Sequence, residues 1–109
     1  MDRMEPLNLS KAPPRSPRER LDGLPMMPRT IDKIRATLPG GNPGEYTIVG
    51  FSQLLLDMIG VREEDLRNAV ARADSDEDVA AWLREHAQTD KYADTINRFE
   101  VAKIGDVPD

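Results

Sequence analysis

The chain has no cysteine and only one histidine among its 109 residues. Without cysteine there is no disulfide framework, no thiolate nucleophile and no cysteine ligand for a metal ion. A single imidazole cannot build a metal site, so we expect neither a metal nor another cofactor. Stability must come from the packing of an ordinary apolar core.

Long apolar runs are also missing, so the sequence predicts a cytoplasmic protein with no signal peptide and no membrane partner. The net charge of −5 is unevenly spread: residues 1–35 hold eight basic against five acidic residues, or +3, and residues 36–109 hold seven against fifteen, or −8. Phosphate contacts need a concentrated basic face, so this acidic body argues against a nucleic-acid partner. A small basic corner near the start of the chain remains as a possible binding feature.

Length and proline content predict one domain with an extended start. A chain of 109 residues has room for one modest core. Pro6, Pro13 and Pro14 remove backbone donors, which favours an extended arm over residues 1–14. We expect a helical domain over residues 15–105 and a C-terminal tail over residues 106–109.

The remainder of the chain carries helix signals at short intervals. Ser16 and Glu19 have the spacing of a capping box, which predicts a first helix from Ser16 to about Gly23. The spacing of the apolar residues, and the glycines and prolines that end helices, predict an all-α fold. We expect about five or six short helices around one Gly/Pro-rich loop, residues 39–50. The later helices are expected to begin near Met26, Ser52, Val61, Ser75 and Asp90, the last ending at Gly105. The latter part of the loop, Thr47–Val49, favours a short extended segment.

Three Pro-Arg dipeptides lie close together near the start, at Pro14-Arg15, Pro17-Arg18 and Pro28-Arg29. Proline suits the first helical position, so Arg18 and Arg29 would lie beside helix N-termini, which attract anions. Lys33 follows Arg29 by four residues and shares its helix face. We hypothesise that a phosphate or carboxylate binds at a basic corner formed by Arg15, Arg18, Arg29 and Lys33.

Glu45 and Tyr46 follow the glycines of the loop and could place a carboxylate and a phenol over this corner. They complete the candidate ligand site. The alternative interpretation is structural, because neighbouring charges usually satisfy one another. In that case the arginines pair with the acidic side chains of Glu19, Asp22, Asp32 and Glu45. The sequence leaves both interpretations open.

The order of these motifs resembles the bacterial domain-of-unknown-function 5069 family. The likeness covers roughly residues 7 to 100 and rests on Pro14-Arg15-Ser16-Pro17-Arg18, Pro28 to Lys33, Gly44-Glu45-Tyr46, Leu56 to Gly60 and Asp78 to Trp82. The resemblance implies a small bacterial helical protein and brings no activity with it. After Tyr46 the chain departs from the family, because residues 47–51 are more apolar than the polar stretch typical there.

Two further motifs are interpreted as structural. The glycines at 40, 41 and 44 lack the Lys-Ser or Lys-Thr of a phosphate loop. The acidic run at 74–78, with Glu85, has the spacing of a calcium-binding loop, but Val79 occupies the position that requires glycine. The run is better explained by Ser75 as a helix cap with acidic residues in the first turn.

Trp82 and His86 fall one turn apart on the helix predicted from Ser75. We interpret Trp82 as a core residue. His86 could serve as a general base with a distant carboxylate, but no serine or cysteine context points to it.

The sequence thus predicts a small helical binding protein for an anionic metabolite or a protein partner. An interaction or adaptor domain, which could form a homodimer, and a small enzyme are the alternatives. No reaction is indicated and no catalytic residue can be named, so the sequence leans away from an enzyme.

Overall fold

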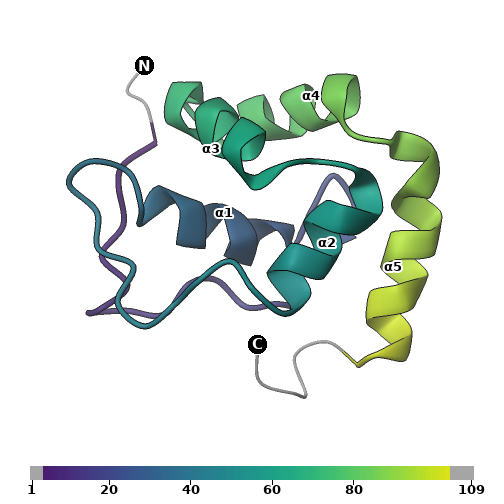
Figure 1. Cartoon of the computed structure of the whole chain (residues 1–109), viewed down its shortest axis with the longest axis horizontal. Helices are drawn as coiled ribbons and strands as arrows, with labels where there is room; N and C mark the ends of the chain where they lie inside the picture. Colours follow the sequence, from purple (N-terminus) through teal and green to yellow (C-terminus); the bar gives the residue numbers. More distant parts are fainter. Residues whose placement is uncertain (1–3, 104–109) are drawn as a thin grey trace.

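Helix α1 (Met27–Arg35) runs through the middle of the fold, and the other elements surround it (Figure 1). The computed structural model describes residues 4–103. Within this range the elements are a hairpin of β1 and β2, a 3-10 turn η1 and five α-helices: β1 (Arg20–Leu21), β2 (Leu24–Pro25), α1, α2 (Phe51–Ile59), α3 (Glu63–Arg72), α4 (Asp76–His86), η1 (Thr89–Lys91) and α5 (Tyr92–Val101). None of the helices in this range is both long and apolar enough to cross a membrane.

The five later helices of the sequence prediction are present, with shifted ends. Helix α1 stops at Arg35 instead of Leu38, because the amides of Thr37 and Leu38 donate to carbonyls three residues back and tighten the last turn. Helix α2 begins one residue before Ser52, with Gly50 at its N-cap. Ser75 is the N-cap residue of α4, although its hydroxyl makes no capping hydrogen bond. The end predicted at Gly105 lies outside the described residues.

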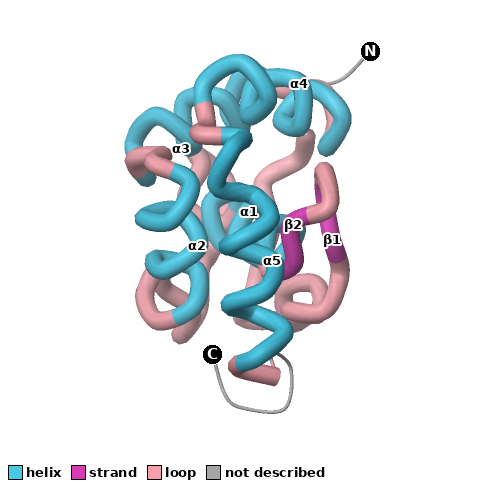
Figure 2. The backbone as a smooth tube through the Cα atoms, turned by 90° about the vertical axis from the view of Figure 1, so that its right-hand side faces the viewer, coloured by secondary structure: helices cyan, strands magenta, loops and turns pink. Residues whose placement is uncertain are grey.

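The first predicted helix is wrong, and the fold is therefore mostly helical but not all-α. The capping box does form, since Glu19 accepts the Ser16 amide and Ser16 Oγ accepts the Arg18 amide, but it closes only one turn. The chain then enters the hairpin, in which Leu21 pairs with Leu24 (Figure 2). Asp22 and Gly23 have φ of 55° and 80°, and this Asp-Gly pair is a strong tight-turn signal.

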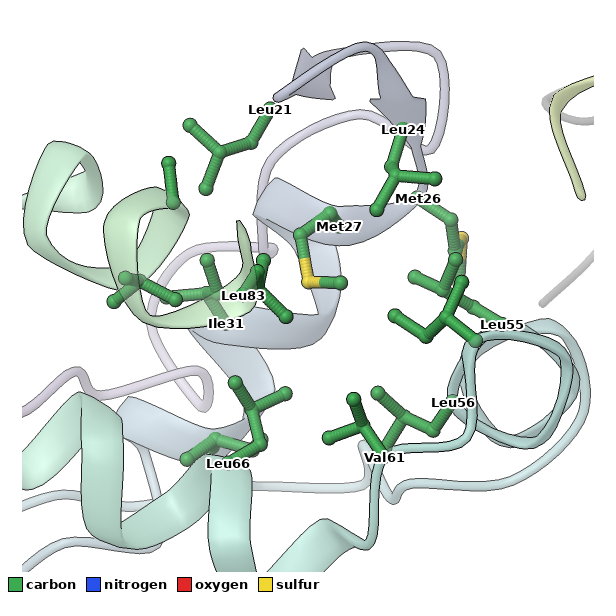
Figure 3. Packing of buried hydrophobic residues seen from close by; sticks show 14 of the residues in the cluster. Leu21, Leu24, Met26, Met27, Ile31, Leu55, Leu56, Val61, Leu66 and Leu83 are labelled. Carbon is green, nitrogen blue, oxygen red and sulfur yellow. The ribbon is translucent and has the colours of Figure 1, made fainter. Parts of the chain in front are cut away.

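The core gathers the inward faces of all five helices and the hairpin around α1 (Figure 3). Met27, Ile31 and Ile34 fall at helical spacing on α1 and are fully buried. Strand β2 and helices α2 to α5 each contribute at least one fully buried side chain to the same cluster, among them Leu24, Leu55, Leu56, Leu66, Leu83 and Phe99. Burial of this face holds α1 in the centre, and its polar residues are carried there with it.

The N-terminal segment lies along the body of the domain. Leu9 donates its amide to the carbonyl of Asn42 at 2.7 Å, and the Asn42 amide donates to Leu7 at 2.8 Å. The Met4 amide donates to the carbonyl of Ala73 at 3.1 Å. The loop residue that adopts extended pairing is thus Asn42, whereas residues 47–49, where the sequence favoured a strand, form none.

Tyr92, the first residue of α5, provides a test of this packing. Its hydroxyl is buried without a hydrogen-bond partner in residues 4–103, and Asp22 lies close by outside hydrogen-bond geometry. Burial, followed by the charge of Asp22, raises the pKa of Tyr92 to about 12. The folded state therefore holds this proton more tightly than the unfolded chain, whose tyrosine titrates near pH ~10. Ionisation of this tyrosine therefore leaves the free energy of unfolding unchanged below that pH and lowers it as the pH rises towards ~12.

We expect Tyr92→Phe to match or exceed the native stability at pH 8, by up to about 1 kcal/mol, because it removes an unsatisfied hydroxyl. The variant should also lose less stability than the native protein between pH 10 and 12. Urea unfolding at each pH measures both effects. If both proteins lose the same stability between pH 10 and 12, the raised pKa of Tyr92 is contradicted.

Candidate functional site

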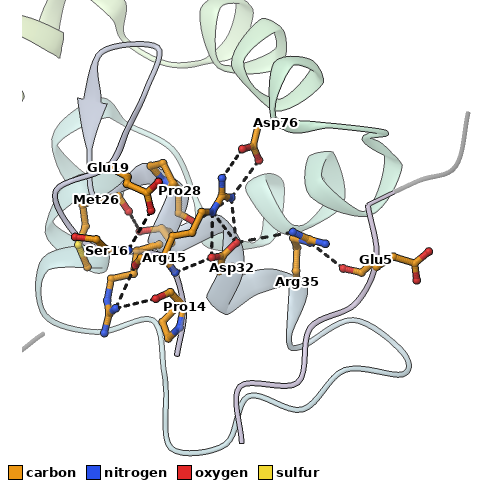
Figure 4. A network of polar contacts seen from close by, with 12 residues as sticks. Glu5, Pro14, Arg15, Ser16, Glu19, Met26, Pro28, Asp32, Arg35 and Asp76 are labelled. Carbon is orange, nitrogen blue, oxygen red and sulfur yellow. Dashed lines mark hydrogen bonds and ion pairs between the residues drawn. The ribbon is translucent and has the colours of Figure 1, made fainter. Parts of the chain in front are cut away.

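Arg15 joins three parts of the chain through one side chain (Figure 4). Its guanidinium donates to both carboxylate oxygens of Asp32 on α1, at 3.0 to 3.2 Å. The same group pairs with Asp76, the first residue of α4. The backbone amide of Arg15 adds a further bond to Asp32, at 2.8 Å. Asp76 and then Asp32 raise the pKa of Arg15 above its ordinary value, so the guanidinium keeps its proton.

Asp32 is the buried centre of this network. Its side chain is 6% exposed because α1 carries it below the N-terminal segment. Arg35 approaches it more loosely, with Nη1 at 3.9 Å from the Asp32 carboxylate, while Nε of Arg35 donates to the Glu5 carbonyl at 2.8 Å. Charge-assisted hydrogen bonds of this kind are the strong ones in proteins. The network therefore ties the N-terminal segment to α1 and α4.

Arg29 lies next to this network and faces Tyr46. Its guanidinium donates to the carbonyls of Arg15 and Pro14, at 3.2 and 3.5 Å. The guanidinium carbon also lies 5.4 Å from the centre of the Tyr46 ring, a cation–π contact. The structure thus brings three of the predicted site residues together: Arg15, Arg29 and Tyr46.

Lys33 is buried against α2. It is 3% exposed, and its Nζ donates to Ser52 Oγ at 3.3 Å. Ser52 also accepts the Thr30 hydroxyl at 3.0 Å, and the N-cap of α2 is Gly50 rather than Ser52. Lys33 is therefore directed towards the α1–α2 contact.

Arg18 and Glu45 lie apart from the Arg15 network. Arg18 is exposed on the turn before the hairpin and lines a hollow with Arg20, Glu100 and Lys103. Glu45 is exposed and makes no hydrogen bond or ion pair within residues 4–103.

Two of the acidic residues named in the structural alternative, Asp32 and Asp22, pair with arginines. Asp32 pairs with Arg15 and Arg35, and Asp22 pairs with Arg84 at 3.0 Å. Glu19 accepts the Ser16 amide in its turn.

A pocket of about 410 Å³ opens between the N-terminal segment and α1. Its lining is charged at Arg15, Asp32 and Arg35, and the remaining lining residues are mostly apolar: Leu7, Asn8, Leu9, Ala12 and Pro13. Arg35 was not among the predicted site residues. Two features of the sequence indicate it: Arg35 follows Asp32 by three residues on the same helix, and a proline-rich arm precedes them in the chain.

Comparison with known protein families identifies the family of this chain. Residues 11–106 match the family described as domain of unknown function DUF5069. The chain belongs to this family. The match to the DUF5069 domain includes Arg15, Asp32 and Asp76 but begins after Leu7 and Leu9, so the paired charges lie inside it and part of the pocket wall lies before it.

Two searches of another kind add no assignment. No curated protein shows a significant match to this DUF5069 chain. In the part of the domain that the structure describes, no cluster of three or more His, Cys, Asp or Glu residues could hold a metal ion.

Removing the Arg15 side chain tests the network. We expect Arg15→Ala to lower the free energy of unfolding by about 2–3 kcal/mol, because the buried Asp32 carboxylate loses its main partner. Arg15→Lys should recover only part of this loss, since an ammonium cannot bridge two carboxylates as a planar fork does.

Arg62→Ala is the matched control for urea unfolding. Arg62 pairs with Glu64 on the surface, their side chains being 78% and 71% exposed. Its loss should change stability by less than about 0.5 kcal/mol. An Arg15→Ala protein as stable as this control would show that the network does not hold the domain together.

Proposed function

We propose that this protein binds a small anionic molecule in the pocket between its N-terminal segment and α1. The observation that carries the proposal is the state of Arg35. Its side chain is only 17% exposed, its Nε is used by Glu5, and its contact to Asp32 is long. Nη2 of Arg35 has no hydrogen-bond partner within residues 4–103, so this group retains donors for a ligand at the pocket wall.

The lining indicates the kind of molecule. Leu7, Leu9, Ala12 and Pro13 offer apolar contact in the same pocket as the arginines. A carboxylate or phosphate accepts two parallel hydrogen bonds from a guanidinium, and its apolar part would pack against the N-terminal segment. A volume of about 410 Å³ suits a small metabolite. The ligand class is therefore a small organic acid or phosphate ester with an apolar portion.

Arg15 has a positioning role in this proposal, because Asp32 and Asp76 already occupy its guanidinium. Arg29 and Tyr46 support the segment that carries Arg15. A bacterial, cytoplasmic setting is part of the proposal, and the lack of cysteine fits a reducing compartment.

The other function classes receive less support. Val49 and Val101 are the exposed large hydrophobic residues of the described range, and they lie on separate segments. An adaptor or homodimer surface would need a continuous apolar patch. An enzyme would need Glu45, Tyr46 or Asp57 in a cleft with the arginines, and none of them lines the pocket described above.

A thermal-unfolding screen tests the proposal with carboxylate and phosphate metabolites at fixed ionic strength. A compound at a hundred times its dissociation constant should add about 2.7 kcal/mol, or on the order of ten degrees in a domain of this size. Arg35→Gln should abolish the shift, and Arg62→Gln should leave it unchanged. If no compound stabilises the protein, or if the shift survives in Arg35→Gln, this pocket is not an anion site.

A further inference from the structure

A second pocket lies between α3 and α4, on residues that the proposed site does not use. Its volume is about 370 Å³. Gly60 and Val61 close one end, and the walls come from Asp65, Asn68 and Arg72 on α3 and from Trp82 and His86 on α4. A smaller hollow of about 180 Å³ shares Arg72 and Trp82 and extends towards Asp78. Together they form a groove, which we call the α3–α4 groove.

The α4 wall of the groove carries a stacked pair of aromatic rings. The Trp82 and His86 rings are stacked, with centroids 4.6 Å apart and planes inclined by 14°. His86 Nδ1 lies 2.9 Å from the Trp82 carbonyl, and a carbonyl can only accept, so Nδ1 carries the proton. The His86 ring is thereby held against Trp82, and two aromatic side chains line one pocket.

The α3 wall carries three polar side chains in a row. Asp65, Asn68 and Arg72 have spacings of three and four residues, so they share one helix face. None of these three side chains makes a hydrogen bond or ion pair within residues 4–103. Asp65 and Arg72 are about 10 Å apart along the helix axis. The row therefore offers an acceptor at one end, an amide in the middle and a cationic donor at the other end.

We propose that the α3–α4 groove binds a free nucleoside monophosphate. The base would extend the Trp82–His86 stack on an outer ring face, with its donors and acceptors towards Asp65 and Asn68. The phosphate would lie at Arg72, which presents a guanidinium with unused donors. A flat heterocycle joined to an anion at this separation matches the row of groups on α3, and the groove volume suits one nucleotide.

A free nucleotide fits the surroundings better than a nucleic-acid strand does. The helices that form the groove also carry seven other acidic residues, Glu63, Glu64, Asp74, Asp76, Glu77, Asp78 and Glu85, counting the turn between them. These carboxylates would repel the successive phosphates of a nucleic-acid strand, whereas Arg72 can pair with a single phosphate.

Trp82 is the only tryptophan of the chain and so reports directly on the groove. Each of the four common nucleoside 5′-monophosphates is titrated against the native protein while Trp82 fluorescence is followed. We expect at least one to quench the emission with saturation. Arg72→Ala should weaken its affinity about tenfold, because a charged hydrogen-bond donor is lost. The matching nucleoside, which has no phosphate, should bind Arg72→Ala and the native protein equally.

Arg62→Ala removes the same charge outside the groove and should bind like the native protein. Arg35→Gln should do the same, which separates this site from the pocket beside α1. The proposal fails if no nucleotide quenches Trp82 at millimolar concentration, or if Arg72→Ala binds as well as Arg62→Ala. It also fails if a short single-stranded RNA binds far more tightly than the nucleotide, with a steep dependence on salt.

Discussion

A carboxylate buried on the central helix must be paired, and the N-terminal half of the fold is arranged around that requirement. Asp32 lies on the helix whose apolar face forms the core, so packing takes it out of water. An unpaired charge in such a place would cost several kcal/mol, on the order of 3 or more. Arg15 meets the requirement with its amide and its guanidinium, and by also reaching Asp76 it fixes α4 against α1.

This pairing decides which cation is left for a ligand. Arg15 was one of the four basic residues predicted to bind an anion, but it is paired with two carboxylates. Arg35 shares Asp32 only at long range and keeps donors at the pocket wall. The same N-terminal segment that brings Arg15 to Asp32 supplies the apolar side of that pocket. Stability and the proposed binding thus draw on one arrangement.

The helices were largely predictable because their signals are local. Apolar residues that recur at helical spacing mark a helix in the sequence. Examples are Met27, Ile31 and Ile34 in α1, and Leu66, Ala69 and Val70 in α3. The first predicted helix does not form, because the Asp22-Gly23 pair six residues after Ser16 turns the chain into a hairpin. Between Leu21 and Leu24 that pair favours a two-residue hairpin turn, and the hairpin forms. The partners of Arg15, Lys33 and Ser52 could not be predicted, since each lies on another element and depends on how the helices cross.

Hydrogen exchange in Arg15→Ala tests most directly whether this network anchors the N-terminal segment. The amides of Met4, Leu9 and Asn42 bond between that segment and the body of the domain, and they report on its attachment. The account predicts that these amides lose protection together in Arg15→Ala, while amides within α2 and α5 stay protected. If they exchange as slowly as in the native protein, the segment is held by other contacts and the Arg15–Asp32 pair is not the anchor.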